Sequence, residues 1–87
     1  MKRKHEWDYF SSLVAKHIKE YTIPQFGDTP DDLASTWSAD KCVEEIKRYI
    51  WRFNQGQRGE EETRRDLLKV AHYAAMAYRK LEGQTPE

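Results

Sequence analysis

Hydrophobic side chains recur along most of this chain every three or four residues, which is the spacing of one face of an α-helix. The first stripe predicts a helix over about residues 7–21 and consists of Phe10, Leu13, Val14, His17, Ile18 and Tyr21. The second predicts a helix over about residues 39–53, with Cys42, Val43, Ile46, Tyr49, Ile50 and Phe53 inside. The third predicts a helix over about residues 60–81, with Leu67, Val70, Ala71, Ala74, Ala77, Tyr78 and Leu81.

The segment between the first two stripes carries strong helix-breaking signals. Pro24 and Gly27 interrupt the pattern, so residues 22–30 are expected to form a loop. Thr29 and Pro30 are then typical of a helix start, because threonine caps well and proline suits the first helical position. We expect a short helix there that ends before the second stripe.

The remaining helix ends are marked by capping residues. Ser38 is a typical N-cap for the second stripe, and residues 54–59 form a polar loop with two glycines. Three acids open the last helix and Gly83 stops it. No segment alternates with a period of two, so no strand is predicted. The pattern therefore predicts an all-α fold: a small helical bundle of three longer helices and one short helix.

Length and composition limit what this bundle can be. The 87 residues form one domain over 1–87, with residues 1–6 and 83–87 expected to be flexible. With 34% charged residues and a mean hydropathy of −1.01, the buried core is small, and a homo-oligomer is expected. The net charge of zero argues against nonspecific binding of nucleic acid. No segment has the ~20 apolar residues of a membrane span.

Cysteine, histidine and acidic residues show no pattern typical of a catalytic or metal site. Cys42 is alone, which excludes a disulfide framework and suits a reducing cytosol. Glu44 and Glu45 begin a magnesium motif of helical nucleotide pyrophosphohydrolases, but Arg48 stands where the next acid belongs. Ion pairs of Glu44 with Arg48 and of Lys41 with Glu45 are the simpler interpretation. We expect no metal, no cofactor and no catalytic group.

The segment from Lys47 to Phe53 instead favours ligand binding. Trp51 points away from the predicted core with cations one turn away, and such a ring can stack a base while the cations contact phosphate. The predicted ligand-binding residues are Lys47, Arg48, Trp51, Arg52, Arg58, Arg65, Lys69 and His72. A Trp51 buried against another subunit explains the same pattern equally well.

Two segments carry a resemblance to a known family. Arg48-Tyr49-Ile50-Trp51-Arg52, a polar loop with glycines, and then Asp66-Leu67-Leu68-Lys69-Val70-Ala71-His72-Tyr73 resemble the SaV-like small phage proteins over about residues 46–74. The family is often labelled as nucleotide kinases. Asn54 and Arg65 depart from its usual glycine and acid. The resemblance implies a phage or prophage origin and the cytoplasm of a bacterial host.

Three functions follow from these patterns. The first is a non-enzymatic, phage-type protein that sequesters a phosphorylated nucleotide, such as a signalling nucleotide of bacterial defence. The second is an inhibitor or adaptor that binds a host or defence protein, with the acidic segment 28–45 imitating nucleic acid and Trp37 and Trp51 as anchors. The third is a magnesium-dependent nucleotide hydrolase whose metal site is shared between subunits.

Overall fold

The computed structural model describes residues 2–29, 33–56 and 59–83, and the described residues contain helices and no strand. The elements are α1 (Lys2–His17), the π-helix η1 (Ile18–Thr22), α2 (Ile23–Phe26), the 3-10 helix η2 (Leu33–Thr36), α3 (Ala39–Gln55) and α4 (Glu60–Leu81). The predicted all-α fold of three longer helices and one short helix is confirmed.

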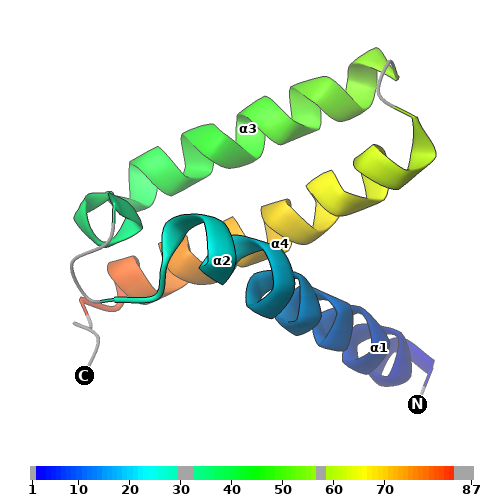
Figure 1. The fold of residues 1–87 in the computed structure, drawn as a ribbon, viewed down its shortest axis with the longest axis horizontal. Helices are drawn as coiled ribbons and strands as arrows, with labels where there is room; N and C mark the ends of the chain where they lie inside the picture. Colours follow the sequence, from blue (N-terminus) through cyan, green and yellow to red (C-terminus); the bar gives the residue numbers. More distant parts are fainter. Residues whose placement is uncertain (1, 30–32, 57–58, 84–87) are drawn as a thin grey trace.

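α4 is the central element, because it contacts both α3 and α1 (Figure 1). α3 and α4 run antiparallel as a hairpin, and α1 lies across α4 in front of it, with the N-terminus projecting away from the hairpin (Figure 1). A hydrogen bond of 3.1 Å from Lys80 Nζ to the carbonyl oxygen of Ala34 ties η2 to the end of α4. α1 therefore covers part of one side of the hairpin, along α4.

The ends of α3 and α4 follow the capping rules. Ser38 Oγ accepts a hydrogen bond of 3.1 Å from the backbone N–H of Lys41, as an N-cap should. α3 ends at Gln55, two residues after the predicted end near Phe53. Gly56 caps it in the left-handed conformation, with a φ of 63° and a ψ of 22°. Both predicted bounds of α4 are correct.

The prediction was wrong for the first helix. α1 begins at Lys2, so most of the expected flexible end 1–6 is helical, and the helical chain continues through Pro24. Proline lacks an N–H and crowds the carbonyl four residues before it, and a π-helix relieves this conflict. The N–H of Ile23 bonds the carbonyl of Ile18, five residues back, and Gly27 with a φ of 85° finally ends the helix.

Two other expectations fall partly outside the described residues. The short helix predicted from Thr29 and Pro30 is seen only as η2, because residues 30–32 lie outside the described part of the chain. The end of the chain was expected to be flexible from Gly83 onward, and residues 84–87 also lie outside it.

The buried core is smaller than the stripes predict. Among the described residues, five side chains are buried: His17, Cys42, Tyr49, Asp66 and Ala77. Several predicted core residues are instead exposed, namely Tyr21, Val43, Ile50, Phe53, Leu67, Tyr78 and Leu81. For the residues of α3 and α4, the physical reason is that α1 lies on one side of the hairpin, so apolar residues on the other side remain at the surface. Periodicity identifies an apolar side of a helix but not whether another element covers it.

Candidate functional site

Three aromatic rings stack in a row at the contact between α3 and α4. Trp37 stacks on Tyr73 with ring centroids 5.9 Å apart, and Tyr73 stacks on Tyr49 at the same distance. Interplanar angles of 18° and 20° make both contacts parallel stacks. Tyr49 is buried because it follows Cys42 by seven residues, two helical turns, and so faces α4 as Cys42 does. The row gives the hairpin a rigid aromatic centre.

Three cationic side chains gather around the Tyr49 ring. The guanidinium carbons of Arg48 and Arg52 lie 5.1 Å from the ring centroid, and Lys69 Nζ of α4 lies 5.2 Å from it. Arg48 also pairs with Glu45, with 3.0 Å between Nε and Oε2. Within residues 2–29, 33–56 and 59–83, neither Arg52 nor Lys69 has a carboxylate partner. Their positive charge is therefore available to an anion.

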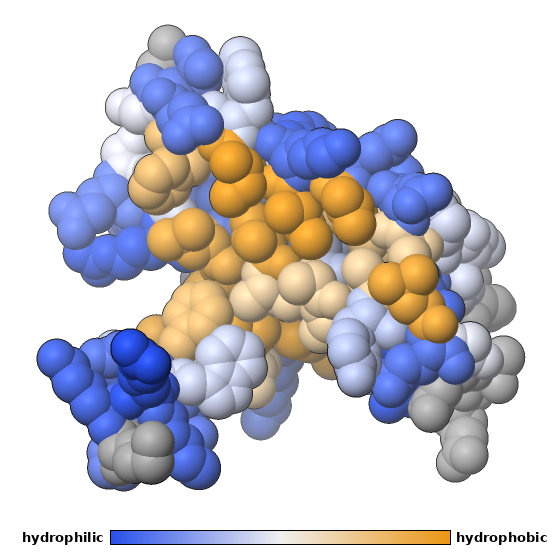
Figure 2. All heavy atoms as spheres, turned by 180° about the vertical axis from the view of Figure 1, so that it is seen from behind, coloured by the Kyte–Doolittle hydropathy of each residue, from blue (hydrophilic) through white to orange (hydrophobic). Residues whose placement is uncertain are grey.

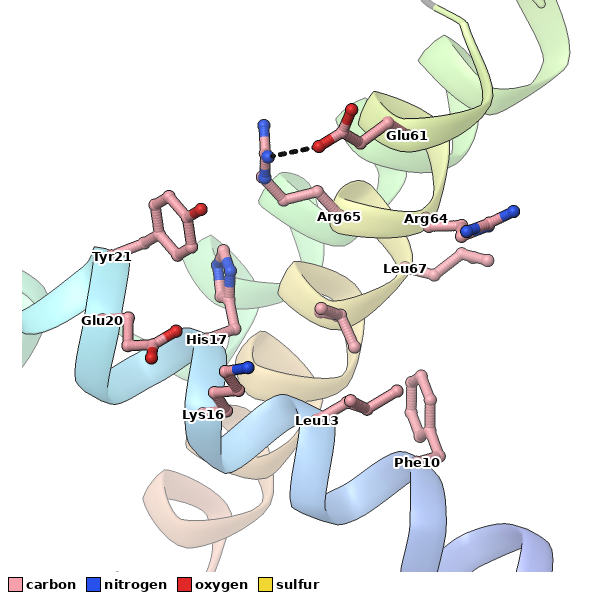
Figure 3. A pocket seen from close by; sticks show the side chains of 11 residues that line it. Phe10, Leu13, Lys16, His17, Glu20, Tyr21, Glu61, Arg64, Arg65 and Leu67 are labelled. Atoms are coloured by element: carbon pink, nitrogen blue, oxygen red, sulfur yellow. Dashed lines mark ion pairs between the residues drawn. The ribbon is translucent and has the colours of Figure 1, made fainter.

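A second group of the same kind lies where η1 meets α4. The His17 and Tyr21 rings stack with centroids 5.4 Å apart, and the Arg65 guanidinium lies 5.1 Å from the Tyr21 centroid. Arg65 is held by Glu61, with 3.6 Å between nitrogen and oxygen, and by Glu62. Figure 3 shows Tyr21, His17 and Arg65 pointing toward one another across the gap between the two helices.

This second group forms one end of a pocket of about 470 Å³ between α1, η1 and α4. The lining residues are Phe10, Leu13, Lys16, His17, Glu20, Tyr21, Glu61, Arg64, Arg65, Leu67 and Leu68. Apolar side chains such as Leu13 and Phe10 lie at the other end (Figure 3). The volume lies in the range of small-molecule sites, and an apolar wall beside a few convergent polar groups is typical of them.

The charges around His17 connect the two groups. Burial lowers the pKa of His17, and the positive charges of Lys69 and Arg65 lower it further, as does His72 when it is protonated. Lys69 therefore acts both on the Tyr49 ring and on the imidazole that lines the pocket. Burial also lowers the pKa of His72. Both imidazoles are neutral at pH 7, so each can donate one N–H without adding charge.

Five of the eight predicted site residues lie in or beside these groups: Arg48, Arg52, Arg65, Lys69 and His72. Trp51 is 64% exposed and follows the buried Tyr49 by two residues, so it points to nearly the opposite side of α3. Lys47 precedes Trp51 by one turn and shares that side. Arg58 lies outside the described residues.

The rings beside the cations are Tyr49 and Tyr21, which the sequence pattern assigned to the core. Tyr21 follows His17 by four residues, a spacing that places two side chains together on a helix and could have indicated this pair. Trp37, the expected anchor for a protein partner, stacks on Tyr73 instead. Asp31 and Asp32 of the acidic segment lie outside the described residues.

Other groups singled out in the sequence take structural positions. Cys42 is fully buried, and burial raises the pKa of its thiol above the usual range. Glu45 pairs with both Lys41, at 3.8 Å, and Arg48, so the expected Lys41 pair is confirmed while Arg48 pairs with Glu45 rather than Glu44. In the described part of the chain, no three His, Cys, Asp or Glu side chains come together as metal ligands.

None of the helices among the described residues combines the length and the apolar character needed to cross a lipid bilayer. Comparisons of the chain with protein-family models, with curated proteins and with solved structures find no match. The resemblance to the SaV-like proteins therefore stays a prediction. The function has to be inferred from the geometry of the cationic and aromatic groups themselves.

Proposed function

We propose that this chain is a non-enzymatic binding protein for a phosphorylated, nucleotide-like ligand. The observation that carries the proposal is the meeting of Arg52 and Lys69, from two different helices, at the Tyr49 ring. Neither cation is neutralised by a carboxylate within the described residues. The Tyr21 pocket with its own cation, Arg65, lies on the same side of α4.

In this proposal the phosphate groups contact Arg52 and Lys69. Hydrogen bonds between a charged donor and a phosphate oxygen are roughly twice as strong as neutral ones. Stacking on Tyr49 restricts both cations, so less side-chain entropy is lost when an anion binds. The site therefore selects anions through two pre-positioned charges rather than through the net charge of the chain, which is zero.

The planar base of the ligand would occupy the pocket beside Tyr21. The Tyr21 ring already stacks with His17 and Arg65, and Phe10 adds a second ring to the lining. Stacking of a base on an aromatic ring contributes about 1–3 kcal/mol and tolerates any base. The neutral imidazole of His17 supplies an N–H that could give orientation. This arrangement binds and holds a ligand without a chemical step.

The resemblance to small phage proteins gives this binding a biological setting. A phage protein that holds a phosphorylated nucleotide in the cytoplasm of a bacterial host would remove it from solution. A signalling nucleotide of bacterial defence is the ligand that fits such a role, and sequestration needs affinity and abundance rather than turnover.

The proposal is tested by calorimetric titration with nucleoside mono-, di- and triphosphates, cyclic oligonucleotides and unphosphorylated nucleosides. We expect phosphorylated ligands alone to bind, and Arg52→Ala and Lys69→Ala each to weaken binding at least tenfold, because a charge-assisted hydrogen bond contributes about 1.5–3 kcal/mol. Lys47→Ala is the matched control, since it removes the same charge from the opposite side of α3. Equal losses in all three variants, or no binding of any phosphorylated ligand, would contradict the proposal.

A further inference from the structure

The side of the α3/α4 hairpin that faces away from α1 carries two apolar rows with a coiled-coil spacing. On α3, Val43, Ile46, Ile50 and Phe53 follow one another at intervals of three, four and three residues. On α4, Leu67, Val70, Ala74, Ala77 and Leu81 follow at three, four, three and four. This alternation is the heptad pattern that lets one helix pack along another through knobs and holes.

Both rows turn toward the same side of the hairpin. In an antiparallel pair of helices, residues displaced in the same rotational sense from the contact lie on the same side. Relative to the buried residues Cys42 and Tyr49 on α3 and Asp66 on α4, both rows are displaced in that sense, with Ala77 at the buried edge of the α4 row. Figure 2, seen from behind, shows an apolar band across this side of the molecule. We call it the apolar face, formed by these nine residues together with Ala71 and Tyr78.

In the described part of the chain, most of the apolar face is left uncovered, apart from Ala77, which is buried, and Leu67, which borders the pocket beside α1. Its largest members, Val43, Ile50, Phe53, Leu67, Tyr78 and Leu81, are 39–79% exposed. Soluble monomers rarely leave so many neighbouring apolar side chains in water, and a continuous apolar patch of this kind marks an interaction surface.

The accessible surface area of the chain can be compared with the area that a subunit buries in a dimer. The accessible surface is 6957 Å², whereas a compact monomer of this mass should expose about 5,400 Å². The radius of gyration of 13.8 Å also exceeds the roughly 12 Å of a compact domain of this length. The excess of about 1,600 Å² lies within the range of about 1,000–2,500 Å² that one subunit of an obligate homodimer buries.

We infer that a second copy of this chain covers the apolar face, so that two α3/α4 hairpins pair as a four-helix bundle with α1 outside. Two helices with adjacent heptad rows form half of such a bundle, and a two-fold axis supplies the other half from an identical surface. Ala71 and Ala74 leave room for bulky side chains such as Ile50 and Phe53 from the partner. A chain with zero net charge does not repel its copy.

The apolar face and the ligand pocket share one residue, Leu67, which also lines the pocket between α1 and α4. The other members of the face do not line that pocket, so a substitution at one of them tests the pairing separately from ligand binding. The test is the mass in solution by light scattering over about 1–100 μM, with Ile50→Glu and Trp51→Glu as matched variants. Each adds one negative charge to an exposed position of α3, but only Ile50 belongs to the apolar face. We expect about 21 kDa, twice the 10.4 kDa of one chain, for the unmodified protein and for Trp51→Glu, and one chain for Ile50→Glu.

The inference would be overturned if the unmodified protein is a monomer or a larger assembly, or if Ile50→Glu is still a dimer. A monomeric unmodified protein would mean that the apolar face binds an unrelated partner. If Ile50→Glu fails to fold, the melting temperature of the unmodified protein is measured at several protein concentrations instead. A dimer requires this temperature to rise with protein concentration, and a constant value would overturn the inference. Phe53→Gln, which adds no charge and lies outside the pocket, should then weaken dimerisation at least tenfold and keep the helical circular dichroism spectrum.

Discussion

The ammonium group of Lys69 on α4 lies 5.2 Å from the centre of the Tyr49 ring on α3. This contact joins the two arms of the hairpin and holds a cation beside Arg52, which lies over the same ring. A cation over an aromatic ring gains about 0.5–2 kcal/mol, depending on how far it is desolvated. The same side chain therefore contributes to the packing of the hairpin and to the charge offered to an anion.

The Tyr49 ring should be a major source of stability. Tyr49→Leu removes the stack on Tyr73 and the contacts with three cations, and we expect a loss of about 2 kcal/mol in the free energy of unfolding. Trp51→Leu removes an exposed ring two residues away and should change that free energy by less than about 0.5 kcal/mol. Urea unfolding followed by circular dichroism measures both values. Equal losses would contradict the assigned orientation of α3.

The left-handed conformation of Gly56 should matter for the end of α3. A side chain with a Cβ is strained at a φ of 63°, and Gly56→Ala should cost about 1–2 kcal/mol. Gly56→Asn is the control, because asparagine tolerates this conformation and should cost clearly less than alanine. Thermal unfolding distinguishes the two variants. Identical melting temperatures would mean that Gly56 is not held in the left-handed region.

Stability should fall on mild acidification. The pKa of His17 is lowered from 6.5 in the folded chain, chiefly by burial. Between that lowered pKa and 6.5 the unfolded chain binds more protons, so the free energy of unfolding rises with pH there. The contribution is complete above 6.5 and is lost as pH falls through the folded pKa.

We therefore expect the urea midpoint to decrease from pH 7.5 to pH 5.5. His17→Phe keeps a ring on Tyr21 but cannot titrate, so its decrease should be shallower. His5→Phe, at an exposed position of α1, should keep the full decrease. An unchanged decrease in His17→Phe would show that this imidazole does not couple protonation to folding.

The ligand should distinguish between two candidate stacking rings. If the pocket holds the base, Tyr21→Ala removes its stacking partner and should weaken binding about 5- to 150-fold, the equivalent of about 1–3 kcal/mol. Trp51→Ala should leave the affinity unchanged, because Trp51 points away from Arg52 and Lys69. Calorimetric titration with the tightest-binding nucleotide gives both affinities. The reverse order would favour the site that the sequence pattern alone predicts.

The sequence predicted some helices better than others, for physical reasons. α4 was correct at both ends because a glycine precedes it, three acids form its first turn and another glycine follows it. The first helix was wrong because Pro24 normally stops a helix, while the π-turn that admits it depends on the packing of η1. The cations Arg52 and Lys69 could be predicted as site residues from their positions in the sequence. The Tyr49 ring beside them could not, because a tyrosine on an apolar stripe is equally typical of a core.

The most direct test of the account is to follow the His17 imidazole by NMR during a pH titration, with and without the tightest-binding phosphorylated nucleotide. Lys69 and Arg65 help to lower the pKa of His17, so an anion bound among them must raise it. We expect a higher pKa in the complex and the largest shift changes at His17, Tyr21 and Tyr49. An unchanged pKa of His17, with the shift changes centred on Trp51 and Lys47, would contradict the proposed site.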